Sequence, residues 1–136
     1  VTTGNAGQFN GNNYNYLDET AYSLKINYAG FEADYRKNDA GNFGYIKNGN
    51  ASNNEGTSIC GGYTFGSIRA MACSLDTSFI DANNRTNSSE TTTYAADYSL
   101  GRGVTLGLLY FDVEQTANDQ TRTDVDGLMT MLAIGF

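Results

Sequence analysis

The final stretch of the chain, residues 126–136, alternates between two kinds of side chain. One parity is apolar except for a threonine and consists of Leu128, Thr130, Leu132, Ile134 and Phe136. The residues between them are small or flexible, so the stretch has the period of two that is typical of a β-strand with one apolar face. In a soluble domain, a strand of this kind is usually held in place by a later segment of the chain. In a transmembrane barrel the last strand instead pairs with the first, because hydrocarbon tolerates no open sheet edge.

The same alternation recurs upstream in three hairpins. Short turns are expected at residues 29–30, 66–67 and 101–103. The first of them, Ala29-Gly30, suits a tight primed turn. Long polar connections are expected at residues 37–56, 76–90 and 112–124. Residues 1–20 are rich in Asn and Gly and are expected to form an outer loop, which leaves seven strands within residues 21–136 of one domain.

The composition is polar on average, yet it does not exclude a membrane location. A helical membrane protein needs an apolar run of about 18 or more residues, and the sequence contains none. In a transmembrane barrel only alternate residues meet lipid, so the average stays polar. The formal net charge of −7 indicates that nucleic acid is not a partner, because nucleic acid is bound by basic surfaces.

The expected connections are sorted by length, with short turns at one end of the strands and long loops at the other. This sorting is typical of outer-membrane barrels, which have short periplasmic turns and long outer loops. Strands of about ten residues also match the span that a tilted strand needs across hydrocarbon. We therefore predict an all-β fold, a transmembrane antiparallel β-barrel. Because bacterial barrels have an even strand count, at least one further strand is expected before residue 21.

The final strand ending on Phe136 and the turn Gly101-Arg102-Gly103 give the chain a resemblance to Gram-negative outer-membrane general porins of the alphaproteobacterial type. The resemblance extends over nearly the whole chain and implies the last seven strands of a sixteen-stranded barrel. It also implies an outer-membrane location, a homotrimer, and a membrane-insertion signal at Leu132, Ile134 and Phe136. In that family the pore-constricting loop lies in the first half of the barrel, outside this segment.

The polar face of the expected strands carries charged side chains. They are Lys25, Glu32, Asp34, Arg36, Arg69 and Asp97. In a barrel these residues would line a water-filled lumen and tune the passive diffusion of ions and small hydrophilic solutes, and the acidic members favour a mild cation preference. In a soluble protein they would form the solvated face. A turn at residues 29–30 places Lys25 opposite Asp34, so we expect an ion pair there.

Cys60 and Cys73 are the two cysteines of the chain. A turn at residues 66–67 places them opposite each other on a non-hydrogen-bonded pair, where the α-carbons approach most closely. This predicts a disulfide on the lumen side, in agreement with an oxidising compartment. Two free cysteines, or a redox-active pair near Arg69, are the alternatives.

Enzymatic activity is not expected. The sequence contains no histidine, the commonest general base, and it indicates no cofactor. Asp119, Asp124 and Asp126 lie near the final strand, and Asp124-Val125-Asp126-Gly127 resembles part of a calcium loop without its full spacing. Weak calcium binding is therefore the one metal hypothesis, beside the simpler interpretation as a polar loop.

Two other functions are compatible with the pattern. A small barrel of about eight strands, with its first strand within residues 5–17, would act as a surface anchor or adhesin without a pore. Such a barrel is filled by its side chains, whereas many expected inward residues are small: Gly62, Ala95, Gly107, Ala133 and Gly135. A soluble secreted sheet domain is the third hypothesis, and it would need a second sheet to cover the row of Tyr, Leu and Ile.

Overall fold

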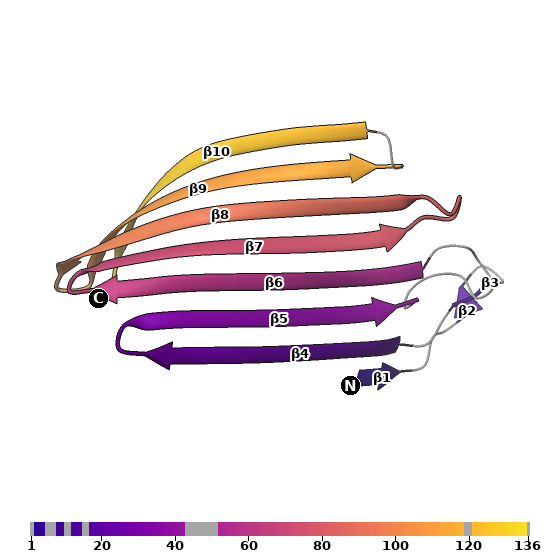
Figure 1. Cartoon of the computed structure of the whole chain (residues 1–136), viewed down its shortest axis with the longest axis horizontal. Coiled ribbons are helices and arrows are strands. Elements are labelled where there is room, and N and C mark those ends of the chain that lie inside the picture. Colours follow the sequence, from indigo (N-terminus) through magenta and orange to yellow (C-terminus); the bar gives the residue numbers. More distant parts are fainter. Residues whose placement is uncertain are drawn as a thin grey trace.

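The protein is described by a computed structural model, which places residues 2–4, 8–9, 12–14, 17–42, 52–118 and 121–135. These residues form an all-β, antiparallel structure dominated by one sheet of long strands (Figure 1). The sheet is open, as Figure 1 shows by the separation of its first and last strands. No helix among the described residues is long and apolar enough to cross a membrane.

The seven expected strands are confirmed, and each pairs with its neighbours in the chain. They are β4 (Leu17–Tyr28), β5 (Phe31–Gly41), β6 (Ser52–Phe65), β7 (Ile68–Ile80), β8 (Thr86–Gly101), β9 (Val104–Ala117) and β10 (Thr121–Ile134). A short strand, β1 (Thr2–Gly4), adds to the edge of the sheet by pairing with the first residues of β4. Two further short strands, β2 (Gln8–Phe9) and β3 (Asn12–Asn13), pair with each other.

The strands extend further than the sequence pattern predicts. The expected loop at residues 1–20 contains β1, β2, β3 and the start of β4. The expected long loops at 76–90 and 112–124 shrink to residues 81–85 and 118–120, of which 119–120 lie outside the described residues. Only the connection at residues 42–51 remains long, so the predicted sorting of short turns and long loops is wrong for two of three connections.

The expected strands are too short because Thr- and Ser-rich segments, which have no apolar face, were predicted to be loops. In β8, residues 86–93 contain no large apolar side chain, yet they pair continuously with Thr93 opposite Cys73 and Thr86 opposite Ile80. Threonine is β-branched and favours strands. Backbone pairing with an already formed neighbour therefore continues the strand after the apolar alternation has ended.

The turn at Ala29-Gly30 has the predicted primed geometry, because both residues have positive φ angles, +48° and +86°. Gly30 is also enclosed: a Cβ at this position would lie 2.6 Å from the backbone oxygen of Thr64. The Gly30 carbonyl accepts a hydrogen bond from the Thr64 N–H at 2.8 Å. The turn thus contacts the neighbouring strand and requires glycine at its second position.

We predict opposite effects for two substitutions in this turn. Gly30→Ala should lower the free energy of unfolding by more than about 1 kcal/mol, because it adds both a clash and a left-handed alanine. Ala29→Gly should raise it by up to about 1 kcal/mol, since it removes an existing left-handed alanine. Urea unfolding of the full-length protein in detergent would measure both. Equal effects of the two variants would contradict the turn geometry.

The loop at residues 81–85 is organised by the Asp81 carboxylate. Its Oδ1 accepts the backbone N–H groups of Asn83 at 2.8 Å and Arg85 at 3.0 Å. Its Oδ2 lies 3.1 Å from the guanidinium Nη2 of Arg85. The backbone N–H of Arg85 is the main reason that the pKa of Asp81 lies below its usual range, with the other donors adding to it against partial desolvation.

This loop should therefore loosen only in strong acid. A carboxylate whose folded-state pKa is lowered contributes stability above its ordinary pKa of about 3.9. That stability is lost as the pH falls through the lowered value. NMR titration of the Asn83 and Arg85 amides should show a midpoint below about 3.9 that disappears in Asp81→Asn. A midpoint at or above the ordinary value would contradict the loop geometry.

The sheet has no hydrophobic core. Among the described side chains only Ala40 and Gly107 are buried, and none of the large ones is fully covered. Twenty-four large apolar side chains are instead exposed. A layered domain stabilises itself by burying such side chains between its layers, so both faces of this sheet require a covering that the described residues do not supply.

Candidate functional site

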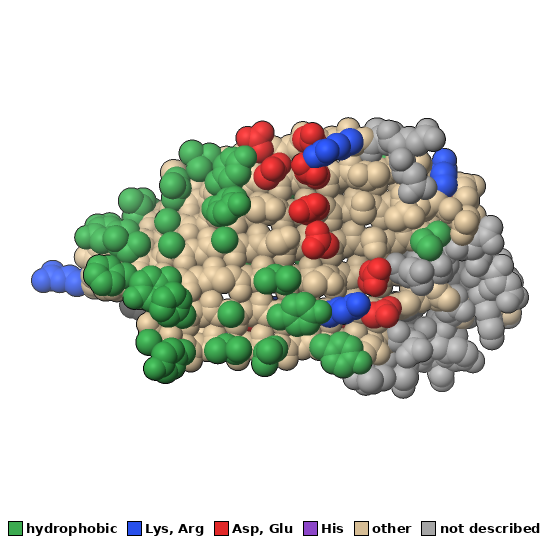
Figure 2. Space-filling view, in the orientation of Figure 1, with side chains coloured by type: hydrophobic (Ala, Val, Ile, Leu, Met, Phe, Trp, Pro, Cys, Tyr) green, Lys and Arg blue, Asp and Glu red, His purple; other side chains and the backbone are tan. Residues whose placement is uncertain are grey.

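One face of the sheet carries a continuous apolar band. We call this face the front face, because it is turned toward the viewer in Figure 2. There the apolar band lies over the half of the sheet that contains the two-residue turns. The residues of the band are cross-strand neighbours on adjacent strands. The exposed ones include Leu24, Ile26, Ile59, Ile68, Leu106, Leu108, Leu132 and Ile134.

Aromatic side chains flank this band on both sides. On β4, Tyr22 and Tyr28 enclose the aliphatic residues between them, over a length of about 20 Å at about 3.3 Å per residue. Near the turns, the Phe31 and Tyr63 rings lie 4.3 Å apart. On the far side, Tyr94 stands opposite Tyr110 with 6.3 Å between ring centroids. An apolar band between two aromatic girdles is the pattern of a lipid-facing barrel surface.

Beyond the band, the front face becomes strongly acidic. We call this surface the acidic belt, and it consists of Asp39, Glu55, Asp76, Glu90, Asp112, Glu114, Asp124 and Asp126. It crosses the sheet as a line of carboxylates (Figure 2). Two cations lie among them, Lys37 and Arg122, so the net charge of the belt and its two cations is −6.

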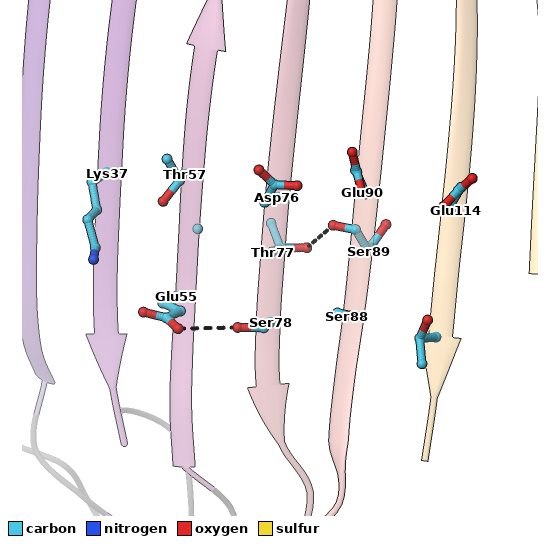
Figure 3. Close-up of a pocket in the computed structure, with 12 residues that line it drawn as sticks. Lys37, Glu55, Thr57, Asp76, Thr77, Ser78, Ser88, Ser89, Glu90 and Glu114 are labelled. Carbon is cyan, nitrogen blue, oxygen red and sulfur yellow. Dashed lines mark hydrogen bonds between the residues drawn. The ribbon is translucent and has the colours of Figure 1, made fainter. Parts of the chain in front are cut away.

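Four of these carboxylates stand side by side on consecutive strands. Asp76 is opposite Glu90, which is opposite Glu114, which is opposite Asp124. Arg122 forms ion pairs with Glu114 and Asp124, the latter at 3.0 Å. The polar groove between the strands, with Glu55 accepting a hydrogen bond from Ser78 at 3.4 Å, is shown in Figure 3. Like charges directly opposite each other are unfavourable in a sheet, so this line is not explained by fold stability.

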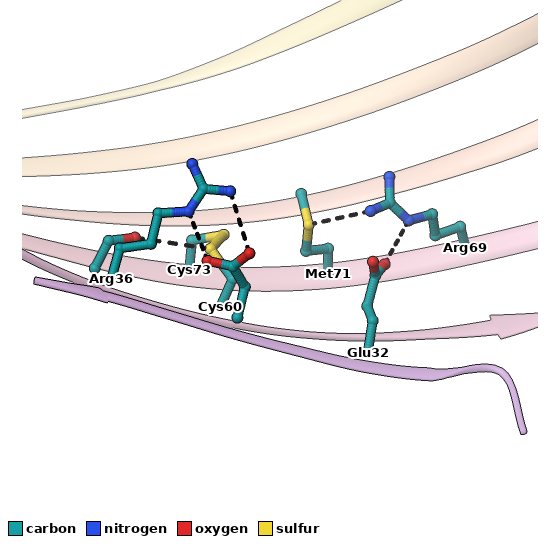
Figure 4. The surroundings of a disulfide bond; sticks show 8 residues. Glu32, Arg36, Cys60, Arg69, Met71 and Cys73 are labelled. Carbon is teal, nitrogen blue, oxygen red and sulfur yellow. Dashed lines mark hydrogen bonds and ion pairs between the residues drawn. A yellow bond between two sulfur atoms is a disulfide. The ribbon is translucent and has the colours of Figure 1, made fainter. Parts of the chain in front are cut away.

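All six predicted lumen residues lie on the opposite face, which we call the rear face. Arg69 connects three strands there: its Nε lies 2.6 Å from Glu32 Oε1, and its Nη1 lies 3.9 Å from Asp97 Oδ2 (Figure 4 shows the Glu32 contact). Arg36 pairs with Asp34 of the same strand at 2.7 Å. The predicted ion pair of Lys25 with Asp34 is wrong in detail, because Asp34 is opposite Lys25 but pairs with Arg36.

The six residues comprise three acids and three bases, so their charges cancel. The acidic excess of the described strands lies on the front face, in the belt. The mild cation preference expected from the acidic members of this set stays a prediction. The sequence alternation correctly assigned the faces but did not reveal this division, because the belt lies in segments interpreted as loops.

A glycine makes the Arg69–Glu32 contact possible. These residues belong to β7 and β5, with β6 between them, and Gly62 occupies the position between their strands. A Cβ on Gly62 would lie 2.8 Å from Glu32 Oε1 and 3.1 Å from the Ala70 backbone oxygen. The neighbouring Gly61 points to the front face, where an added Cβ would meet nothing within 4 Å.

The two adjacent glycines provide a matched test. Gly62→Ala should lower the free energy of unfolding by about 1–3 kcal/mol, because the added methyl group would crowd the Ala70 carbonyl oxygen and push the Glu32 carboxylate away from Arg69. Gly61→Ala should be neutral or slightly stabilising, since glycine weakens a strand interior. Urea unfolding in detergent would compare them. A loss in Gly61→Ala equal to that in Gly62→Ala would show that the Arg69–Glu32 contact does not depend on this gap.

The predicted disulfide between Cys60 and Cys73 is confirmed, on the rear face (Figure 4). The two residues are a cross-strand pair with α-carbons 4.1 Å apart. This distance fits a non-hydrogen-bonded pair. Their strands are already joined by the turn Gly66-Ser67, so the bond encloses a short loop and adds little constraint on pairing.

Removing the disulfide should therefore weaken the sheet without changing its register. Cys60→Ser combined with Cys73→Ser should lower the free energy of unfolding by an amount near the low end of about 2–4 kcal/mol. Reduction of the unmodified protein should have the same effect and leave the double variant unchanged. A change of β6–β7 pairing in backbone NMR contacts would contradict this expectation.

An apolar patch on the rear face was not predicted from the sequence. The small inward residues were noted, but between them stand Leu109, Phe111, Val113, Val125, Met129 and Met131. We call this group the rear patch; it covers β9 and β10. Its Phe111 lies over Gly127, where an added Cβ would be 2.5 Å from the ring. The alternation in residues 109–113 and 125–131 is a sufficient signal, because every odd-numbered residue there except Gly127 is apolar.

Other predicted site residues lie on the front face or outside the described residues. Leu132 and Ile134 belong to the apolar band, opposite Leu106 and Val104, whereas Phe136 lies outside the described residues. Asp124 and Asp126 belong to the acidic belt. Asp119 is likewise not described, and the described residues contain no group of three His, Cys, Asp or Glu side chains placed to hold a metal ion.

No protein-family model matches the chain, and neither curated proteins nor solved structures provide a match.

Proposed function

We propose that this chain forms part of the wall of an outer-membrane channel for the passive diffusion of ions and small hydrophilic solutes. The apolar band of the front face carries this proposal. Its side chains are exposed from Tyr22 to Tyr28 on β4, from Leu106 to Tyr110 on β9 and from Leu128 to Ile134 on β10, and aromatic girdles flank it. Lipid is the covering that fits such a band, because hydrocarbon requires apolar side chains on alternate residues and satisfied backbone groups on every strand.

The rear face supports a water-filled lumen. Its ion pairs join Arg69 to Glu32 and Asp97 across strands and Arg36 to Asp34 along β5. They remain partly exposed, with the Arg69 side chain 42% and the Asp97 side chain 36% accessible. Ion pairs in contact with solvent contribute little to stability. These charged side chains can therefore stay hydrated along a channel wall without a large loss of folding free energy. The residues would then act on passing solutes through their charge and their hydrogen-bonding groups.

The proposal requires that the open sheet be closed into a barrel by further strands. In the described part, the outer edge of β10 has no partner strand, and β1 covers only Leu17–Glu19 of β4. The resemblance to general porins supports closure by further strands into a sixteen-stranded, trimeric barrel. Enzymatic activity is not part of the proposal.

The rear patch favours a second candidate, a small barrel without a through-pore. The inward side chains of an eight-stranded barrel fill its interior. Leu109, Phe111 and Met129 would be suitable fillers, whereas Lys25, Glu32 and Arg36 would have to be accommodated in the same interior. Such a barrel would act as a surface anchor or adhesin.

Conductance across a planar bilayer distinguishes these candidates. The full-length protein, purified from its source membrane, should produce discrete open-channel steps in potassium chloride and have a denatured mass well over twice 14.7 kDa. A membrane protein with a mass near that value and no conductance would support the small barrel. Recovery from the soluble fraction without detergent would overturn both candidates and favour the secreted sheet domain.

Neighbouring substitutions on β4 should separate the two faces. Ile26, which is 56% exposed, lies on the front face, and Asn27 lies on the rear face. Ile26→Arg should impair membrane insertion, because an arginine facing lipid near the bilayer centre costs about 2–4 kcal/mol. Asn27→Arg should insert normally. Yield of folded protein in liposomes would measure this, and equal loss in both variants would contradict the assignment of the faces.

A further inference from the structure

The rear face is divided into two regions of different chemistry. Over β5 to β8 it carries ion pairs, whereas over β9 and β10 it carries the rear patch. Met129 and Met131 remain 54% exposed, and Val125 remains 53% exposed. A lumen wall for purely hydrophilic solutes has no need of a contiguous apolar surface, so this patch requires a different explanation.

An acidic side chain lies at the border of the rear patch. Asp97 on β8, Gly107 on β9 and Met131 on β10 are consecutive positions of one cross-strand row. Gly107 is itself buried, because the Asp97 and Met131 side chains extend over it. A Cβ added there would lie 3.1 Å from Asp97 Oδ1 and 3.4 Å from Met131 Cε. The carboxylate oxygen and the methionine methyl group therefore converge over the glycine.

Asp97 is the least neutralised acid of the ion-paired group. Glu32 lies 2.6 Å from Arg69, and Asp34 lies 2.7 Å from Arg36. Asp97 lies 3.9 Å from Arg69, whose guanidinium already pairs with Glu32. Glu32, Arg69 and Asp97 together carry a net charge of −1. The charge beside the apolar surface is therefore complementary to a cation.

We propose that Asp97 and the adjoining rear patch bind small organic cations that carry an apolar substituent, such as alkylammonium ions. The ammonium group would lie at Asp97 and the alkyl group over Met131, Leu109 and Met129. Methionine is flexible and adapts to apolar groups of different shape. An anionic amphiphile would be repelled by the net charge of this cluster, and a neutral one would gain nothing from Asp97. This solute class rests on the proposed channel, in which the rear face lines the interior.

The test uses NMR of the full-length protein in detergent, with labelled methionine methyl groups. The three methionines of this sequence, Met71, Met129 and Met131, all lie on the rear face. Titration with hexylammonium should shift the Met131 and Met129 signals to saturation, with a smaller shift at Met71, whose sulfur accepts a hydrogen bond from Arg69 at 3.6 Å. Hexanol and hexanoate, which have the same chain length, should bind at least about tenfold more weakly.

Two variants carry the matched control. Asp97→Asn should weaken hexylammonium binding at least about tenfold, whereas Asp112→Asn, the same change on the front face, should leave it unchanged. Gly107→Ala should also weaken binding, because its methyl group would lie 3.1 Å from Asp97 Oδ1 and 3.4 Å from Met131 Cε and would displace both side chains. Equal binding of hexanol, equal effects of the two asparagine variants, or no saturable shift would each overturn the proposal. Potassium chloride conductance, measured in parallel, tests the channel separately, so either proposal can fail while the other stands.

Discussion

The structure depends on one constraint: a single-layer sheet with no core has two faces, and each must meet a suitable environment. Its backbone ladder satisfies the hydrogen bonds between neighbouring strands, but it leaves the large apolar side chains of the front face uncovered. Burial of apolar surface is the main favourable term in folding. The stability of this chain therefore depends on what covers the front face. We propose that lipid is this covering, because the apolar band is bounded by tyrosines.

Small residues adapt the sheet locally to this arrangement. Gly62 lets the Arg69 and Glu32 side chains meet across an intervening strand, and Gly107 lets the Asp97 and Met131 side chains converge over it. At Gly127 the opposite solution is used, with the Phe111 ring filling the space that a side chain would occupy. At these positions the rear face has glycine because a neighbouring side chain occupies the space. Small residues there therefore do not mean that the whole rear face is polar.

The alternation of the sequence was sufficient to predict the strands, the turns, both faces and the disulfide, because a period of two fixes the side of every residue once a turn is located. It could not predict where the strands end. Residues 86–93 lack an apolar parity, and their strand conformation depends on pairing with β7. Nor could it predict that Asp34 pairs with Arg36 instead of Lys25, since this choice depends on side-chain rotamers. The acidic belt was not predicted, because most of its residues lie in segments expected to be loops. The rear patch was not predicted, because small residues such as Gly107 and Ala133 occupy the same face.

The central claim is that the front face meets lipid and the rear face meets water. Paramagnetic broadening tests this most directly, with methyl-labelled full-length protein, a lipid-soluble nitroxide and a water-soluble gadolinium chelate. The lipid probe should broaden Leu24 and Leu108 and spare Met71 and Met129, whereas the aqueous probe should do the reverse. Broadening of Leu24 and Leu108 by the aqueous probe, without an effect of the lipid probe, would contradict this claim.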